Sequence, residues 1–214
     1  MALELYSHPL ASFCWKVLIA LYDTDTPFEP LLVDLSNSTA AENFKRVWPI
    51  AKFPVLRDTA RNQLVPESTI IIEYLAQHFP AARDLIPQDP DAALETRLRD
   101  RFFDLYVSEP MQKIVLDKLR PPGANDPHGV TQAKNSLEVA YDMLERDMIG
   151  RTWATGDHFD MADCSAAPAL YYANRVAPIG QRPNVRAYLE RLQQRPSFAR
   201  VLREAEPYFA LFPG

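Results

Sequence analysis

The residues with the clearest potential for binding chemistry lie in two neighbouring stretches of the chain. The first reads Lys52-Phe53-Pro54-Val55-Leu56, an apolar segment with a proline near its start, and the second opens with Pro66-Glu67-Ser68 and continues as a long apolar run. Proline at the head of a strand has no N–H to donate, which suits a bend or a cis peptide bond. A helix start attracts anions, because its first N–H groups lack partners and its dipole is positive there. Together these stretches offer a backbone edge, a carboxylate and an anion site to one peptide-like, anionic ligand.

Each of these residues also has an ordinary structural explanation. Ser68 is a favoured N-cap, and Pro54 suits an edge strand. Only their combination at this spacing indicates a binding site, and it leads us to predict a cis peptide bond before Pro54.

Predicted strands and helices alternate over the first 80 residues, and these elements must position the candidate binding residues. The patterns predict strands at residues 3–6, 28–33, 54–57 and 63–65, and helices at 12–22, 40–48 and 67–79. The order βαβαββα predicts a mixed sheet with crossover helices. It is the order of a thioredoxin-like α/β domain, although a C-x-x-C pair is absent.

The second half of the chain has a helical pattern only. Residues 80–90 are rich in Pro and Asp, which indicates a linker, and helices are expected at 130–148, 160–176, 183–194 and 197–206. A further long helix is predicted, because Leu94, Leu98, Phe102 and Leu105 lie at helical spacing on one stripe, and we expect Pro110 to kink it at about its middle. We therefore expect a thioredoxin-like domain at residues 1–80 and an all-α helical-bundle domain at residues 90–214.

The two binding stretches resemble the glutathione-binding half of cytosolic glutathione transferases. That family reads N-P-x-G-K-V-P-x-L and then E-S-x-A-I-x-x-Y-L; here Trp48, Ala51 and Phe53 replace Asn, Gly and Val. A second segment, residues 155–163, is similar to the family's G-D-x-x-[ST]-x-A-D helix start, with Asp160 where Ser or Thr is usual. The resemblance runs from about Leu3 to Phe209, and the chain looks like a bacterial, theta- or zeta-like member.

The resemblance implies a glutathione S-transferase that uses glutathione as co-substrate. Glu67 would bind the γ-glutamyl ammonium, and Ser68 with the helix start would bind the adjacent carboxylate. The backbone of Phe53 would pair with the cysteinyl part as a strand adds to a sheet edge. Lys52 would hold the glycine carboxylate.

Ser12 is the candidate that activates the thiol. The thiolate is the nucleophile, and a free thiol has a pKa of about 8.5, so a hydroxyl at a helix start would stabilise the anion. In theta- and delta-like members the activating serine lies four residues before a basic residue, as Ser12 lies before Lys16. In zeta-, tau- and omega-like members the key position is one earlier, which is Ala11 here. Ser12 also fits a plain N-cap.

Three other donors stay open. Tyr6 matches the strand position of the activating tyrosine in other classes, and a backbone N–H of the loop would also serve. Cys14 could form a mixed disulfide with glutathione, but it lies about 200° round the helix from Ser12 and is expected to be buried.

The second substrate is expected to be an apolar small-molecule electrophile bound against the helical half. Candidate wall residues are Phe102, Phe103, Tyr106, Met111, Tyr171 and Tyr172. The same fold would also suit a glutathione-dependent isomerase, a dehalogenase, a thiol reductase or peroxidase, a non-catalytic glutathione-binding protein, or a structural partner domain.

Composition limits the remaining functions. The 214 residues are 47% hydrophobic with a net charge of −5, so nucleic-acid binding has no electrostatic support. Two cysteines indicate a reducing compartment, and the four histidines have no metal-site spacing. The chain shows no signal peptide and no apolar run of about 20 residues. We expect a cytoplasmic protein without metal or membrane contact, and the family resemblance implies a homodimer.

Overall fold

A four-stranded mixed sheet forms the first part of the computed structural model, which describes residues 2–213. Its strands are β1 (Leu3–Ser7), β2 (Glu29–Leu32), β3 (Val55–Asp58) and β4 (Gln63–Pro66). The order across the sheet is β2-β1-β3-β4, with β1 parallel to β2 and β3 antiparallel to both β1 and β4. This is the predicted thioredoxin-like arrangement.

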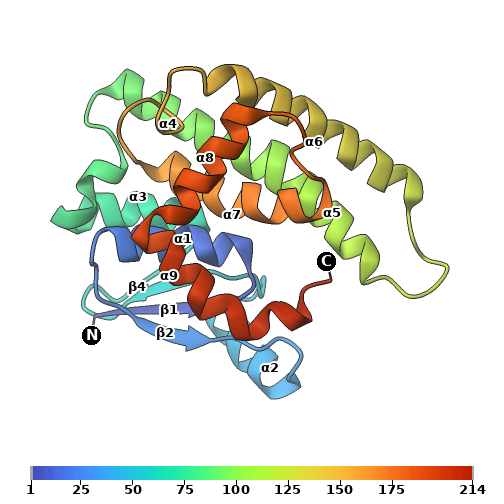
Figure 1. Cartoon of the computed structure of the whole chain (residues 1–214). Helices are drawn as coiled ribbons and strands as arrows, with labels where there is room; N and C mark the ends of the chain where they lie inside the picture. Colours follow the sequence, from blue (N-terminus) through green and yellow to red (C-terminus); the bar gives the residue numbers. More distant parts are fainter. Residues whose placement is uncertain (1, 214) are drawn as a thin grey trace.

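Three helices accompany the sheet. α1 (Ser12–Asp23) and α3 (Ser68–His78) pack against each other, whereas α2 (Ser38–Val47) lies across the far side of the sheet (Figure 1). α1 also packs on α7 and α9 of the second half. α1 therefore lies between α3 of the sheet half and two helices of the second half.

The second half is all helical, as predicted. It contains α4 (Pro90–Phe102), a π-helical segment η2 (Phe103–Ser108), α5 (Glu109–Lys118), α6 (Pro127–Asp147), α7 (Met161–Val176), α8 (Pro183–Gln194) and α9 (Pro196–Ala205). A 3₁₀ helix η1 (Pro80–Leu85) occupies the stretch predicted to be a linker, and a second one, η3 (Glu206–Leu211), follows α9. No helix among residues 2–213 is both long and apolar enough to span a membrane.

A widened turn takes up the backbone change that Pro110 requires. Proline cannot donate to the carbonyl four residues earlier and its ring clashes with that carbonyl. The six-residue π-helix η2 lies directly before α5 and accommodates the missing hydrogen bond. Helices α4, η2 and α5 therefore follow one another without a break.

The predicted apolar stripe of α4 is buried only in part. Phe102 is buried, but Leu94 and Leu98 are 66% and 59% exposed, and Leu105 is exposed as well. The buried face of this helix carries Thr96 and Asp100 instead. Spacing shows that apolar residues share one face of a helix, but it does not say whether the core or another surface covers that face.

Helix α7 begins at a capping box formed by Asp160 and Asp163, within the segment that resembles the family's helix start. Asp160 accepts from the N–H of Ala162 at 2.8 Å, and Asp163 accepts from the N–H of Asp160 at 3.0 Å. Asp163 also accepts from the N–H of Ala154 at 2.9 Å and the Tyr188 hydroxyl at 2.5 Å, all inside the protein. The box thereby fixes α7 to the loop before it and to α8.

Replacing Asp163 by alanine is expected to lower the free energy of unfolding by about 3–5 kcal/mol, because three buried donors lose their acceptor. Urea unfolding followed by circular dichroism measures this change. Asp157→Ala, which removes an exposed carboxylate from the same loop, is the control and should shift the midpoint little. Equal midpoints for the two variants would contradict a structural role for the box.

Candidate functional site

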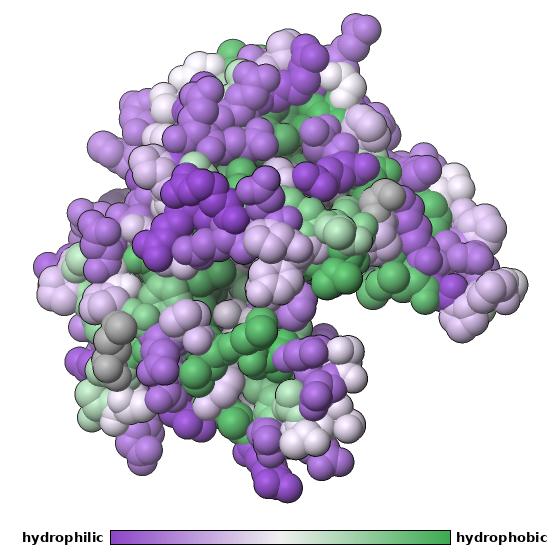
Figure 2. Space-filling model, turned by 60° about the horizontal axis from the view of Figure 1, so that its bottom comes forward, coloured by the Kyte–Doolittle hydropathy of each residue, from purple (hydrophilic) through white to green (hydrophobic). Residues whose placement is uncertain are grey.

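Two adjoining cavities lie where the sheet half meets the helical half. The first has a volume of about 760 Å³ and the second about 430 Å³. Phe13, Lys52, Phe53 and Gln112 line both of them, so the two cavities form one continuous site. Apolar side chains gather around the hollow beside the projecting end of the molecule (Figure 2). The predicted residues Ser12, Lys52, Phe53, Glu67 and Ser68 all line one or both cavities.

The start of α3 forms one end of the first cavity. Glu67 has φ of +70°, a left-handed conformation that is unusual for a residue with a side chain, and α3 begins at the next residue. Within residues 2–213, the N–H groups of Ser68, Thr69 and Ile70 have no acceptor, and the Glu67 carboxylate has no basic partner. This end of the cavity therefore offers both an anion site and a free carboxylate.

The backbone of Phe53 forms the next part of the wall. The Phe53–Pro54 peptide bond is cis, as predicted. Neither the N–H nor the C=O of Phe53 pairs with any other described residue, because β3 starts only at Val55. The Phe53 ring stacks on His8 with centroids 5.9 Å apart, which fixes the segment. An unpaired donor and acceptor on one residue can take up an extended peptide.

Lys52 lies beside Phe53 at the junction of the two cavities. Its side chain is exposed, and its ammonium makes no ion pair with a described residue. It can therefore attract an anionic group of a bound ligand.

The start of α1 forms the junction on the other side. Ala11 is the N-cap residue and Ser12 is the first helical residue, so Ser12 is not the cap itself. The Ser12 hydroxyl and the N–H groups of Ser12 and Phe13 have no partner among the described residues. Ser12 lines the second cavity together with Phe53. The helix start thus presents a hydroxyl and two N–H groups where a negative charge would be stabilised.

The other candidate donors are placed elsewhere. Cys14 is completely buried, and burial raises the pKa of its thiol to about 12. Tyr6 packs on Phe44 of α2, with the guanidinium of Arg57 over its ring, and lines neither cavity. The expectation that Cys14 turns away from the site is confirmed.

The second cavity is largely apolar. Of the six predicted wall residues only Met111 and Tyr172 line it. Phe102 and Phe103 lie in the core, Tyr106 is exposed, and Tyr171 packs on Trp15 with ring centroids 5.4 Å apart. The Tyr172 hydroxyl donates to the carbonyl of Leu10 at 3.0 Å and so ties α7 to the loop before Ser12. The remaining wall includes Leu35, Val115 and the chain end at Leu211 and Phe212, which the sequence analysis did not single out. The apolar segment after α9 was the sequence feature that could have indicated Leu211 and Phe212 as wall residues.

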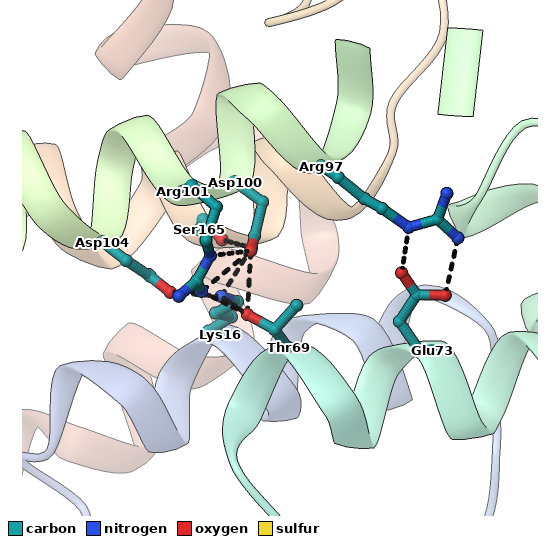
Figure 3. A network of polar contacts seen from close by, with 8 residues as sticks. All are labelled: Lys16, Thr69, Glu73, Arg97, Asp100, Arg101, Asp104 and Ser165. Atoms are coloured by element: carbon teal, nitrogen blue, oxygen red, sulfur yellow. Dashed lines mark hydrogen bonds and ion pairs between the residues drawn. The ribbon is translucent and has the colours of Figure 1, made fainter. Parts of the chain in front are cut away.

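A buried ion cluster beneath the first cavity was not predicted from the sequence. The Lys16 ammonium lies 2.5 Å from Asp100 and 3.0 Å from Asp104, and it donates to the Thr69 hydroxyl at 2.8 Å (Figure 3). Arg101 binds both aspartates from the cavity side. Since Thr69 is in the first turn of α3, the cluster connects the proposed anion site to α1 and α4.

The pKa values of the two aspartates shift in opposite directions. Burial is the largest influence on Asp100 and opposes its ionisation, but the charge of Lys16 and the hydrogen bonds from Lys16, Ser165 and Thr69 together outweigh burial and lower the pKa of this carboxyl. Burial dominates at Asp104 and raises its pKa despite the same ammonium. With Arg101 included, the cluster holds two bases against two acids, so it is close to neutral overall.

Comparisons with known proteins agree with this geometry. Residues 5–83 match the model of the glutathione S-transferase N-terminal domain, and residues 127–191 match the model of its C-terminal domain. A probable maleylacetoacetate isomerase of Caenorhabditis elegans is 31% identical over 211 residues, which cover 95% of this chain and 94% of that protein. The chain belongs to the glutathione S-transferase family. A glutathione S-transferase-like protein of a Fusarium species is 32% identical over 172 residues, covering 79% of this chain and 77% of its own.

Solved glutathione S-transferase structures share the whole fold. One from Methylobacterium radiotolerans, in complex with glutathione sulfonate, has a TM-score of 0.80 at 26% identity and covers 93% of each chain. Another from Methylobacillus flagellatus, with glutathione bound, has a TM-score of 0.83 at 24% identity over 93% of this chain and 98% of its own. The family membership makes this chain a glutathione-dependent enzyme.

Proposed function

We propose that the first cavity binds glutathione through the residues predicted from the sequence. Glu67 takes the γ-glutamyl ammonium, and the free N–H groups at the start of α3, with the Ser68 hydroxyl, take the neighbouring carboxylate. Phe53 pairs its backbone N–H and C=O with the cysteinyl residue, and Lys52 attracts the glycine carboxylate. The unpaired backbone of Phe53 between two helix starts is the observation that carries this assignment.

The cysteinyl sulfur then lies at the start of α1. The Ser12 hydroxyl donates to the sulfur, and the helix dipole adds to the stabilisation of the thiolate. This stabilisation of the anion lowers the thiol pKa toward neutrality, so the thiol proton leaves to solvent.

The reaction we propose is transfer of glutathione to an apolar electrophile in the second cavity. The thiolate attacks an electrophilic carbon, a C–S bond forms, and the leaving group departs with its bonding electrons. Met111, Val115, Leu211 and Phe212 surround the substrate with apolar surface.

An isomerase acting on maleylacetoacetate is the alternative suggested by one relative. That substrate carries two carboxylates, and their binding calls for cationic groups. Lys52 is the single basic residue along the second cavity among the described residues, and we assign it to glutathione. The apolar wall therefore favours an uncharged electrophile.

Two assays separate these functions. The protein is expected to bind a glutathione-affinity column and to conjugate chlorodinitrobenzene, with chloride released in equal amount to the product. Isomerisation of maleylacetone, with no net glutathione consumption, should be slower by at least about 10-fold in kcat/KM. Column binding with isomerisation alone would overturn the transfer reaction but keep the glutathione site.

We also propose that the chain forms a homodimer through an apolar strip made of Ile70 on α3 and Leu94, Leu98 and Leu105 on α4 and η2. All four side chains are exposed, and none of them belongs to the core. Since they are 40–66% exposed, covering each of them would stabilise an interface by about 0.6–2 kcal/mol. The strip contains residues from both halves, so the sheet half of one chain would meet the helical half of its partner.

Light scattering during gel filtration is expected to give twice the chain mass of 24.4 kDa at micromolar concentration. Leu98→Asp should shift the species to a single chain, because burying a carboxylate in an apolar interface is costly. Leu116→Asp, at a similarly exposed leucine on α5, is the matched control and should remain dimeric. A wild-type mass near one chain would exclude the dimer.

Two further assignments accompany this function. We place the domain division at residues 1–80 and 90–214, since the sheet with its three helices ends at α3 and the helices of the second half begin at α4. We propose a cytoplasmic location, because Cys14 and Cys164 are both unpaired and buried, as is usual in a reducing compartment.

A further inference from the structure

The loop between β1 and α1 is held by side chains of two helices. The indole N–H of Trp15 on α1 donates to the carbonyl of Pro9 at 2.5 Å, and the Tyr172 hydroxyl on α7 donates to the carbonyl of Leu10 at 3.0 Å. Helices α1 and α7 pack on each other (Figure 1). The conformation of this loop therefore depends on a contact between the two halves of the chain.

The contact from Tyr172 fixes the peptide group between Leu10 and Ala11. Its carbonyl accepts from the Tyr172 hydroxyl, and its N–H donates to the carbonyl of His8 at 3.0 Å. A peptide group is planar, so holding both of its polar atoms fixes its orientation. Ala11 is the N-cap of α1, with φ of −82° and ψ of 115°, and Ser12 follows it. The fixed peptide therefore sets the direction in which Ser12 enters the helix.

Tyr172 is itself held firmly in place. The residue is 2% exposed, and its ring packs on Trp15 and Phe212 with centroid distances of 4.7 and 5.0 Å. Burial raises the pKa of its hydroxyl, which therefore stays protonated and remains a donor. A hydroxyl has one proton to donate, and here that proton is directed to Leu10. Tyr172 is thus not a hydrogen-bond donor to the glutathione sulfur.

Ser12 and Tyr172 line the same cavity. Thiol activation by Ser12 requires a directed hydrogen bond, which weakens steeply as its angle departs from linear. A displacement of about 1 Å at a reacting group can reduce a rate by about 100-fold. A loop keeps such a geometry only where the surrounding structure fixes it. Within residues 2–213, Tyr172 is the residue of the helical half whose side chain donates to this loop.

We infer that Tyr172 is a positioning residue for thiol activation. Its hydroxyl orients the peptide group between Leu10 and Ala11 and, through that peptide, directs the Ser12 hydroxyl toward the glutathione sulfur. The inference rests on the proposed role of Ser12. It makes the helical half, which lines the electrophile cavity, also responsible for the geometry of the thiolate site.

Tyr172→Phe tests this inference, because it removes the hydroxyl and keeps the ring that packs on Trp15 and Phe212. The apparent pKa of bound glutathione is measured from thiolate absorbance on the whole protein, without an electrophile. We expect a rise of about 0.5–1 unit, since a displaced Ser12 hydroxyl stabilises the anion less. The affinity for glutathione at a pH below the thiol pKa of both proteins should change by less than about 2-fold.

The rate should follow the thiolate population. Below the wild-type thiol pKa, kcat for chlorodinitrobenzene should fall by about 3- to 10-fold in Tyr172→Phe, which is the loss of thiolate that the shift predicts. Well above both thiol pKa values the two rates should converge, because the thiol is ionised in both proteins. Lys52, the charged residue among those that line this cavity, is unchanged in the variant. A changed KM for chlorodinitrobenzene with an unaltered thiol pKa would instead assign Tyr172 to electrophile binding and overturn the inference.

Tyr141→Phe is the matched control. The Tyr141 hydroxyl donates to the carbonyl of Ala177 at 2.9 Å inside the helical half, and Tyr141 lines neither cavity. Its loss removes the same kind of hydrogen bond and should leave the thiol pKa unchanged. In the Ser12→Ala background, Tyr172→Phe should add no further shift, because its effect passes through Ser12.

The inference fails if the thiol pKa is unchanged in Tyr172→Phe, rises equally in Tyr141→Phe, or shifts undiminished in the Ser12→Ala background. Failure of the proposed function gives a different result. A wild-type thiol pKa equal to that of free glutathione, or no glutathione binding, would count against thiol activation itself. A lowered wild-type pKa that rises in Ser12→Ala but not in Tyr172→Phe would refute the positioning role alone.

Discussion

Replacing Glu67 and Ser68 together by alanine is expected to remove most glutathione binding while the fold stays intact. The double variant loses the carboxylate for the ligand ammonium and the hydroxyl beside the ligand carboxylate. Charge-assisted hydrogen bonds of this kind contribute on the order of 2–5 kcal/mol, which corresponds to a loss of affinity of about 30-fold to several thousand-fold. The Glu67 side chain is exposed and unpaired within residues 2–213, so its removal leaves no buried group unsatisfied.

Isothermal titration with glutathione measures this loss. Glu109→Ala is the matched control, because Glu109 is an exposed carboxylate on the same cavity but at the start of α5, away from Glu67 and Ser68. It should change the affinity by less than about 2-fold. The thermal midpoint of both variants should stay close to that of the wild type. An affinity unchanged in the double variant would exclude the start of α3 as the γ-glutamyl site.

Ser12→Ala is expected to lower kcat for chlorodinitrobenzene by about 10- to 150-fold, with little change in KM for glutathione. The Ser12 hydroxyl interacts more strongly with the thiolate than with the thiol, so its loss affects the anion and the reaction rather than binding of the tripeptide. A hydrogen bond to a charged group contributes about 1.5–3 kcal/mol, so the apparent pKa of bound glutathione should rise by about 1–2 units. The ultraviolet absorbance of the thiolate as a function of pH reports this pKa directly.

Cys14→Ala and Tyr6→Phe are the controls for the activating group. With its pKa raised to about 12 by burial, Cys14 carries almost no thiolate at neutral pH. Tyr6 lies on the α2 side of the sheet. Both variants should conjugate at close to the wild-type rate.

A different result would reassign the chemistry. An inactive Cys14→Ala variant, together with a glutathione adduct on Cys14 by mass spectrometry, would place the protein among thiol-transfer enzymes. Full activity and an unchanged thiol pKa in Ser12→Ala would assign activation to the N–H groups of Ser12 and Phe13, which are also free at the start of α1.

Local sequence patterns determined the elements and most of the candidate site. Alternating apolar residues, prolines and capping residues act over a few positions, so the strands, the helix starts and the cis bond before Pro54 followed from short segments. The same short range explains why Glu67, Ser68, Lys52 and Phe53 could be predicted as neighbours. They flank one hairpin, β3–β4, and the hairpin brings its two ends together.

Only the tertiary structure decided which groups meet across the two halves of the chain. Lys16, Thr69 and Asp100 are far apart in sequence, and nothing in their local patterns indicates that they pair inside the protein. For the same reason the stripe that contains Leu94 and Leu98 could be recognised but not assigned to core or surface, because a helical stripe has the same spacing whether a core or a partner covers it. The walls of the second cavity depend on the last residues of the chain folding back over α1 and α7. Such contacts arise from long-range packing, which residue spacing does not encode.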